Sequence, residues 1–249
     1  MQLEKWYADY VADDEAHVFY RANLRLGPVT LGHVGALASA GPASGRFVLG
    51  SVALPTVDGG TVSWPVDGRD ALRWSGAQAR VFALHRNADF DLSWNPWVLN
   101  GTVNGGARGS ARGYVECLRM NFSPWRLGLR VLRWGRFCGA RESLAWIEWQ
   151  GDTALRLLLV NGEPAGLESL SRTEVRSTQG HVLHFEAPRK FGGGPLARYA
   201  FGALPGASVL AAARFFRGVQ ERWLCSARLS TPLRESDAGC AVFEEVHWP

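Results

Sequence analysis

The chain has 249 residues, of which 47% are apolar and 20% are charged. This balance is typical of a folded globular protein and excludes an intrinsically disordered or collagen-like chain. The formal charge of +4 is too small to require a polyanionic partner, since acidic residues are interspersed with the basic ones. No run of about 18 apolar residues predicts a membrane span, and no apolar segment near the N-terminus predicts a signal peptide. We therefore expect a cytoplasmic protein with no integral membrane segment and no nucleic-acid partner.

Strands are predicted along most of the chain, because apolar and polar residues alternate between turn signals. The first half predicts strands at residues 17–26, 29–38, 46–54, 70–75, 79–86 and 90–94. The second half predicts strands at residues 113–120, 143–150, 154–160, 181–188, 222–230 and 241–248. Residues 125–137 fit an extended turn or a short helix, residues 192–195 a loop, and the Ala-rich segment 207–219 a helix. About a dozen short strands indicate an all-β sandwich or barrel.

A glycine-rich segment near mid-chain suggests a division into two halves. Residues 100–113 contain five glycines and no large aromatic residue, which favours a long loop. We therefore predict one β-barrel over residues 1–105 and a second over residues 106–249.

The two halves also resemble each other weakly. The run W-Y-A-D-Y (6–10) is similar to G-Y-V-E-C (113–117), and R-W-S-G (73–76) is similar to E-W-Q-G (148–151). We interpret this likeness as a weak internal repeat.

Standard metal, cofactor and nucleophile motifs do not occur in the sequence. The cysteines Cys117, Cys138, Cys225 and Cys240 form no C-x-x-C pair and have no histidine pair at zinc-finger spacing. We expect reduced, mostly structural thiols, and no metal or cofactor. The sequence leaves the oligomeric state open.

Several sequence blocks resemble a known family. They are Trp6-Tyr7-x-Asp9-Tyr10, L-R-L-G-P (24–28), G-Y-V-E (113–116), P-W-R-L (124–127), L-R-W-G-R-F (132–137), L-A-W-I-E-W-Q-G (144–151) and A-V-F-E-E-V-H-W-P (241–249). They are similar to the carotenoid 1,2-hydratase (hydroxyneurosporene synthase) family and its small lipocalin-like relatives. The resemblance implies two lipocalin-like antiparallel β-barrels packed together, with a cavity for an apolar isoprenoid or polyene-like molecule. It also implies hydratase or cyclase chemistry, including that of pericyclases, without a cofactor.

Three acidic residues on predicted strands are candidate catalytic groups: Glu116, Glu148 and Asp91. Glu116 shares a strand face with Tyr114, and Glu148 shares one with Trp146. A carboxyl group in an aromatic-lined cavity has a raised pKa and can protonate an alkene or an oxygen. The alternative is that each acid pairs with an arginine and is structural. Glu244 is a further acid for which bridging to an arginine is the leading interpretation.

Aromatic residues near these acids are predicted to bind the substrate. They are Trp94, Tyr114, Trp146 and Trp134, and His33 joins them either as a cavity acid or base or as a hydrogen-bonded core residue. A run of six arginines also lies between residues 119 and 141. It is typical of a solvated face with internal ion pairs, and contact with phosphate or a carboxylate is the alternative.

These features together predict a lyase or isomerase that works without a cofactor. It would hold an apolar unsaturated small molecule in one reactive conformation, and hydrate, isomerise or cyclise it. A lipocalin-like carrier of a hydrophobic ligand without catalysis is the alternative, and a domain that binds a polyanion through the arginines is a third.

Overall fold

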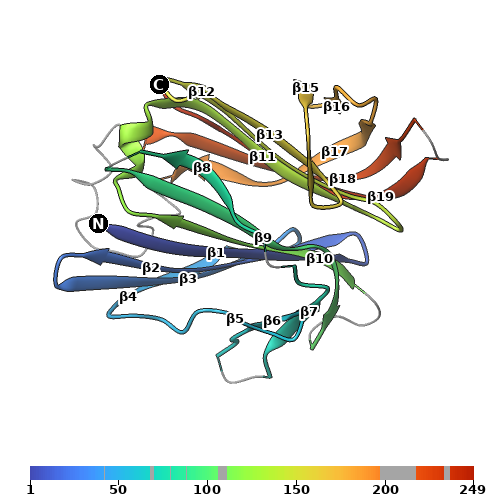
Figure 1. Cartoon of the computed structure of the whole chain (residues 1–249). Coiled ribbons are helices and arrows are strands. Elements are labelled where there is room, and N and C mark those ends of the chain that lie inside the picture. The colour runs from blue at the N-terminus through green and yellow to red at the C-terminus, as the bar shows by residue number, and fades with distance from the viewer. Residues whose placement is uncertain are drawn as a thin grey trace. The chain divides into compact units, whose positions relative to one another are not determined.

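A computed structural model of the chain describes residues 1–41, 43–67, 70–78, 80–87, 89–105, 111–196, 217–232 and 236–249. The chain divides into two compact units (Figure 1). The first covers residues 1–126, and the second contains the described residues from Leu127 onward. Each unit contains one antiparallel sheet, which confirms the predicted all-β class. No helix among the described residues is long and apolar enough to cross a membrane.

The described residues of the first unit form a ten-stranded sheet. Its strands are β1 (Gln2–Ala12), β2 (Glu15–Leu26), β3 (Val29–Ala38), β4 (Ser44–Leu49), β5 (Thr56–Asp58), β6 (Thr61–Trp64), β7 (Leu72–Ser75), β8 (Phe82–Arg86), β9 (Asp91–Asn104) and β10 (Ala111–Met120). Their order is β4-β3-β2-β1-β10-β9-β7-β6-β5, and β8 pairs with β9 outside this path.

The described residues of the second unit form a nine-stranded sheet, which the 3-10 turn η1 (Pro124–Leu127) precedes. Its strands are β11 (Leu129–Gly139), β12 (Ser143–Gly151), β13 (Leu155–Val160), β14 (Glu163–Ala165), β15 (Leu167–Leu170), β16 (Glu174–Ser177), β17 (Val182–Pro195), β18 (Val219–Ser230) and β19 (Asp237–His247). Their order is β14-β13-β12-β11-β19-β18-β17-β16-β15.

The two sheets follow one plan. In each, the first four strands form a meander, and the first strand pairs with the last one. The β1–β10 pair in the first unit and the β11–β19 pair in the second therefore lie in the middle of each strand order, which ends at β4 and β5 in one sheet and at β14 and β15 in the other. The shared strand order supports the predicted internal repeat at the level of topology.

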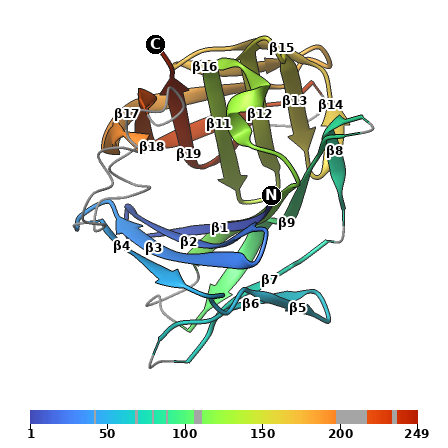
Figure 2. The same ribbon diagram turned by 90° about the vertical axis from the view of Figure 1, so that its left-hand side faces the viewer.

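Aromatic side chains fill the interior of the first unit. Trp6, Tyr10, Trp64 and Trp74 are buried there, and Phe19 packs against them. The ring centroid of Phe19 lies 6.2 Å from those of both Trp64 and Trp74. These rings come from β1, β2, β6 and β7, so the sheet curls until its early and late strands face each other (Figure 2). Each buried tryptophan or tyrosine removes roughly 150–250 Å² from water, which makes these rings the main stabilising element of the unit.

The second unit encloses a separate core. Trp146, Leu158, Leu183, Trp223 and Phe243 are among its buried residues and come from five different strands. The rings of Trp223 and Phe243 stack at 5.3 Å. The sheet also approaches closure, because a side chain of β13 reaches β15: Arg156 Nη2 donates to the carbonyl oxygen of Glu168 at 2.9 Å.

The structure places strand at 100–104 and 111–113, where the sequence predicts a loop, and residues 106–110 of that prediction lie outside the described residues. β9 continues to Asn104 and β10 begins at Ala111. Close packing accounts for two of the glycines: a Cβ on Gly101 would lie 2.5 Å from the carbonyl oxygen of Ser75, and one on Gly113 would lie 2.3 Å from that of Asp9. A glycine in a strand marks close backbone approach as well as a turn, and here the first meaning applies.

The unit boundary also differs from the predicted one between residues 105 and 106. It falls after Arg126, because β10 pairs with β1 and β9 of the first sheet. The predicted loop at 192–195 is part of β17. The helix expected at 207–219 lies outside the described residues except for its last three, of which Val219 begins β18. The four cysteines form no disulfide, and burial raises the pKa of the Cys225 thiol to about 12.

Candidate functional site

Two tyrosines and two carboxylates lie together on one face of the β1–β10 pair. Tyr7 and Asp9 are two residues apart on β1, and Tyr114 and Glu116 are two residues apart on β10, so each pair shares a strand face. The antiparallel register sets Tyr7 opposite Glu116 and Asp9 opposite Tyr114. The four residues, called the Tyr–acid cluster below, therefore alternate around a square.

Hydrogen bonds connect each tyrosine to the acid on its own strand. Tyr7 Oη donates to Asp9 Oδ2 at 2.7 Å, and Tyr114 Oη donates to Glu116 Oε2 at 2.8 Å. The indole Nε1 of Trp94 on β9 donates to the same oxygen of Glu116 at 2.5 Å. Two donors from two strands thus fix the orientation of the Glu116 carboxyl group.

Burial controls the chemistry of this cluster. Asp9 and Tyr114 are fully buried, and Glu116 keeps 9% of its surface exposed. Burial, with the neighbouring carboxylates of Glu116 and Asp9, holds the pKa of Tyr114 well above its ordinary value of 10. The Tyr114 hydroxyl is therefore a permanent hydrogen-bond donor at neutral pH.

Aromatic rings contact the cluster from β2 and β9. Tyr7 contacts the rings of Tyr20 and Tyr114 at centroid distances of 5.3 and 6.2 Å, and Trp94 contacts Phe82 at 5.7 Å. The rings limit the access of water to the carboxylates, which strengthens the hydrogen bonds between them and the tyrosines.

His33 is displaced from the cluster by two strands. It lies on β3, opposite Ala22 of β2, which is in turn opposite Lys5 of β1. Its ring packs on Phe47 at 4.7 Å. Burial and the charge of Lys5 lower the pKa of His33, so the imidazole is neutral near pH 7. The ring is therefore packed and neutral, but within the described part of the chain it makes no side-chain hydrogen bond of the kind that the core alternative expects.

Glu148 lies in the second unit, where two arginines bind its carboxylate. Arg133 Nη1 donates to Oε2 at 2.6 Å, and Arg156 Nε lies 3.2 Å from Oε1. Both arginines are its cross-strand neighbours, on β11 and β13. Glu148 is 6% exposed. These contacts match the structural alternative stated for this residue, and Glu244 is likewise held by Arg222 at 2.9 Å.

The row of charges continues from Glu148 across the sheet. Arg133 Nε donates to Glu245 Oε1 at 3.0 Å, and Glu245 is opposite a second carboxylate, Glu221. Arg172 binds both, with Nη2 at 2.8 Å from Glu245 Oε2 and 3.1 Å from Glu221 Oε2. Its guanidinium also lies 4.7 Å from the ring of Trp223. Arg172 thus offsets the repulsion between two like charges that the register places side by side.

The charge row predicts a loss of stability in acid. Burial raises the pKa of Glu245, but hydrogen bonds from Arg172, His247 and Arg133 outweigh it, and the net pKa lies below the ordinary 4.5. A lowered pKa stabilises the fold above pH 4.5, and this contribution is lost as the pH falls through the pKa of the folded protein. Urea unfolding at pH 6 and pH 3.5 should show a smaller fall in unfolding free energy for Glu245→Gln than for the parent. An equal fall in both proteins would contradict this assignment.

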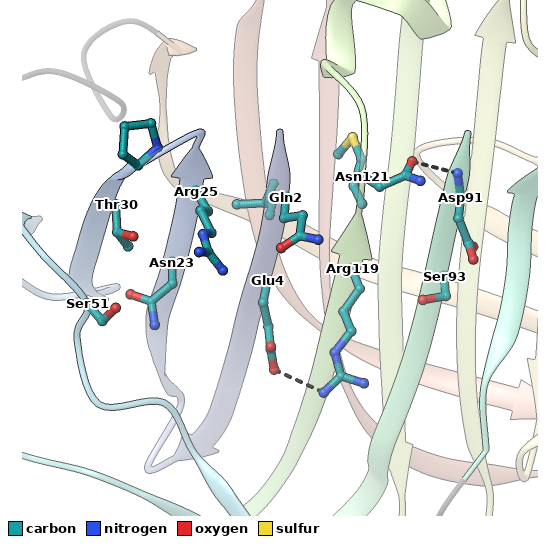
Figure 3. A pocket seen from close by; sticks show the side chains of 13 residues that line it. Gln2, Glu4, Asn23, Arg25, Thr30, Ser51, Asp91, Ser93, Arg119 and Asn121 are labelled. Carbon is teal, nitrogen blue, oxygen red and sulfur yellow. Dashed lines mark hydrogen bonds and ion pairs between the residues drawn. The ribbon is translucent and has the colours of Figure 1, made fainter. Parts of the chain in front are cut away.

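Asp91 lies apart from both other acids, at the rim of a pocket in the first unit. Its carboxylate is 46% exposed and receives Arg86 Nη2 at 3.2 Å, and its backbone N–H donates to Asn121 Oδ1 at 2.8 Å. The pocket has a volume of about 570 Å³ and opens over the ends of β1, β2, β9 and β10 (Figure 3). Its lining is mostly polar, and Asp91 is the one predicted site residue in it.

The structure therefore brings together three of the predicted site residues, Glu116, Tyr114 and Trp94. Trp146 is part of the second core, and Trp134 lies on β11, with both side chains buried. Sequence reasoning missed Tyr7 and Asp9. Their signal was present, because Tyr-x-acid occurs at residues 7–9 and again at 114–116.

Metal ligation finds no support in the part of the chain that the structure describes. There, no three histidine, cysteine, aspartate or glutamate side chains lie close enough together to hold a metal ion. The chemical groups available at the Tyr–acid cluster are thus phenols, carboxylates and an indole N–H.

Comparison with known proteins finds the fold but no close relative. No protein-family model matches the sequence, and no curated protein does. CghA has a similar structure, with a TM-score of 0.59 at 10% identity over 99% of this chain and 88% of its own, and its complex with Sch210972 gives 0.53. Kievitone hydratase from Nectria haematococca gives 0.51 at 9% identity, over 98% and 88%. The chain thus shares its fold with CghA and kievitone hydratase.

Proposed function

We propose that the protein is a lyase or isomerase that acts without a cofactor on an unsaturated, mostly apolar small molecule. The Tyr–acid cluster is the observation that carries this proposal. Two buried carboxylates, each bound to a phenol, are costly to keep in a protein interior unless they are paired or functional. Titratable groups gathered in this way are frequent at catalytic sites.

The groups of the cluster suit proton transfer to and from carbon. Hydration of an alkene adds a proton to one carbon and the hydroxide of a water to the other, so it needs an acid and a base. Isomerisation needs a base that removes a proton from one carbon and returns it to another. A carboxyl group performs either task, and a neighbouring phenol stabilises the charge that develops.

We assign the proton-transfer role to Glu116. Of the two acids in the cluster it is the one with exposed surface, and Trp94 and Tyr114 hold its Oε2. Trp94 and Tyr114 are then positioning residues. Tyr7 and Asp9 complete the square on β1, and the charge of Asp9 helps to keep Tyr114 protonated.

The structural neighbours support the choice of reaction class. One is named as a hydratase of kievitone, and the other is CghA, which is also known in complex with Sch210972. Together with the sequence resemblance they favour hydration, isomerisation or cyclisation of an isoprenoid or polyene-like substrate.

A product screen in labelled water tests the proposal. The purified protein is incubated with a panel of unsaturated small molecules, kievitone and linear isoprenoids among them, in H₂¹⁸O and in D₂O. Hydration adds the mass of one labelled water, whereas isomerisation leaves the mass unchanged in H₂¹⁸O and adds deuterium in D₂O. We expect a product that depends on the protein for at least one member. Saturable binding of panel members with no product from any of them would favour the carrier alternative.

A further inference from the structure

The pocket of the first unit lies on the opposite sheet face from the Tyr–acid cluster. Glu4 on β1 and Arg119 on β10 line it, and both alternate with cluster residues along their strands. A ligand in this pocket is therefore separated from Glu116 by the sheet itself. Its volume of about 570 Å³ is that of a small-molecule site.

Two cross-strand rows of polar side chains form the pocket (Figure 3). The outer row is Thr30, Arg25 and Gln2, each opposite the next in register. The inner row is Asn23, Glu4, Arg119 and Ser93, again in register. Because the rows belong to a paired sheet, the register fixes the backbone positions from which these side chains project.

Most charges in the pocket are already neutralised. Arg119 Nη2 donates to Glu4 Oε1 at 3.0 Å, and Arg86 pairs with Asp91. Arg25 is the exception, because it makes no ion pair within the described part of the chain. One positive charge therefore remains in the outer row, with Thr30 and Gln2 as its cross-strand neighbours.

The inner row offers polar groups that can form hydrogen bonds with the uncharged part of a ligand. Trp6 Nε1 and Arg119 Nη2 both donate to Glu4 Oε1, which leaves Glu4 Oε2 as an acceptor. Ser93 adds a hydroxyl group that makes no hydrogen bond within the described part of the chain. Asn23 is not available to a ligand in the same way, because its side-chain amide is bound to the backbone of Val52. Its Oδ1 accepts from Val52 N at 2.9 Å, and its Nδ2 donates to Val52 O at 3.0 Å.

We propose that this pocket binds a small organic monoanion, a carboxylate whose remaining atoms carry hydroxyl groups. Arg25 binds the carboxylate by charge-assisted hydrogen bonds, and Thr30 and Gln2 flank it. Glu4 Oε2 and Ser93 bind the hydroxyl groups. The site is distinct from the proposed catalytic cluster and does not depend on it.

Three matched probes separate the two parts of this proposal in calorimetric titrations of the full chain. D-gluconate carries both a carboxylate and hydroxyl groups, sorbitol lacks the carboxylate, and hexanoate lacks the hydroxyl groups. We expect gluconate to bind saturably, and each of the others to bind at least about tenfold more weakly. Absence of gluconate binding overturns the proposal. Equal binding of sorbitol removes the role of charge, and equal binding of hexanoate removes the role of the hydroxyl groups.

Arginine variants test whether Arg25 is the group that binds the carboxylate. Arg25→Gln should weaken gluconate binding about tenfold and leave sorbitol unchanged, because only the carboxylate loses its partner. Arg73→Gln is the matched control, since Arg73 is an exposed arginine of β7 outside the pocket that also has no ion pair in the described part. An equal loss in both variants would show a general charge effect and overturn the site.

Side-chain amide signals in NMR spectra test whether gluconate binds in this pocket. In ¹⁵N spectra, gluconate should shift the side-chain amide of Gln2 in the pocket and leave that of Asn161, in the second unit, unchanged. Glu116→Gln should bind gluconate as the parent does, because Glu116 is on the other sheet face. Failure of the proposed catalysis therefore does not affect this test.

Discussion

The Glu116→Gln variant should keep the fold and lose at least about 100-fold of the rate of product formation. Glutamine preserves the shape of the side chain, and its amide oxygen can still accept from Trp94 and Tyr114. It cannot take up or release a proton under these conditions. Rates of the product found in labelled water, with melting temperatures of both proteins, measure the two effects separately.

Glu148→Gln is the matched control, because it makes the same change on a buried glutamate of the second unit. Its expected effect is a loss of about 2 kcal/mol in unfolding free energy with the rate retained. Breaking a buried ion pair costs about 3–5 kcal/mol, and partial exposure of Arg133 and Arg156 reduces that cost. The assignment is wrong if Glu116→Gln lowers only stability, or if Glu148→Gln loses the rate while it keeps its stability.

The antiparallel sheets could be predicted from the sequence because their signal is local. Alternation and turn residues predict β2, β3, β12, β13 and β19 within a few residues of their observed bounds. These patterns depend on neighbouring residues along the chain, and strand period and turn chemistry are local properties.

The Tyr–acid cluster depends on which strands pair, and that is a long-range property. The likeness of 6–10 to 113–117 predicts one copy of a repeat in each half. The structure instead pairs these segments as neighbouring strands of one sheet, so the two Tyr-x-acid motifs meet. In the shared topology, β10 corresponds to β19, the last strand of its unit, rather than to β11. A local likeness cannot distinguish these two arrangements.

The predicted acids differ for the same reason. Glu116 and Glu148 both alternate with aromatic residues on a strand, and their sequence environments look alike. Arg133 and Arg156 reach Glu148 only because β11 and β13 flank β12. The strands beside β10 bring Tyr7 and Trp94 near Glu116 instead. Strand neighbours thus separate an ion-paired acid from one held by phenol and indole groups.

Gly135→Ala should lower the unfolding free energy by about 3 kcal/mol, because the core of the second unit has no room for a methyl group. A Cβ at this position would lie 2.3 Å from Cζ2 of Trp146 and 2.6 Å from Cβ of Phe243. Gly45→Ala is the matched control on strand β4. Its Cβ would be no closer than 3.5 Å to His33 Nε2, so we expect a change within about 0.5 kcal/mol. Urea unfolding of both variants measures the difference.

A double-mutant cycle shows whether the Trp146 ring is the cause. Trp146→Phe removes the part of the indole that would meet the new methyl group. The cavity that it leaves should lower the unfolding free energy by about 2 kcal/mol. If the two side chains compete for one space, Gly135→Ala should cost at least about 1 kcal/mol less in the Trp146→Phe background than in the parent. Phe243 still limits the space, so the rescue is partial. If the losses of unfolding free energy are additive, the strain lies in the backbone of β11 instead. The packing of Trp146 against Gly135 would then not explain why residue 135 is a glycine.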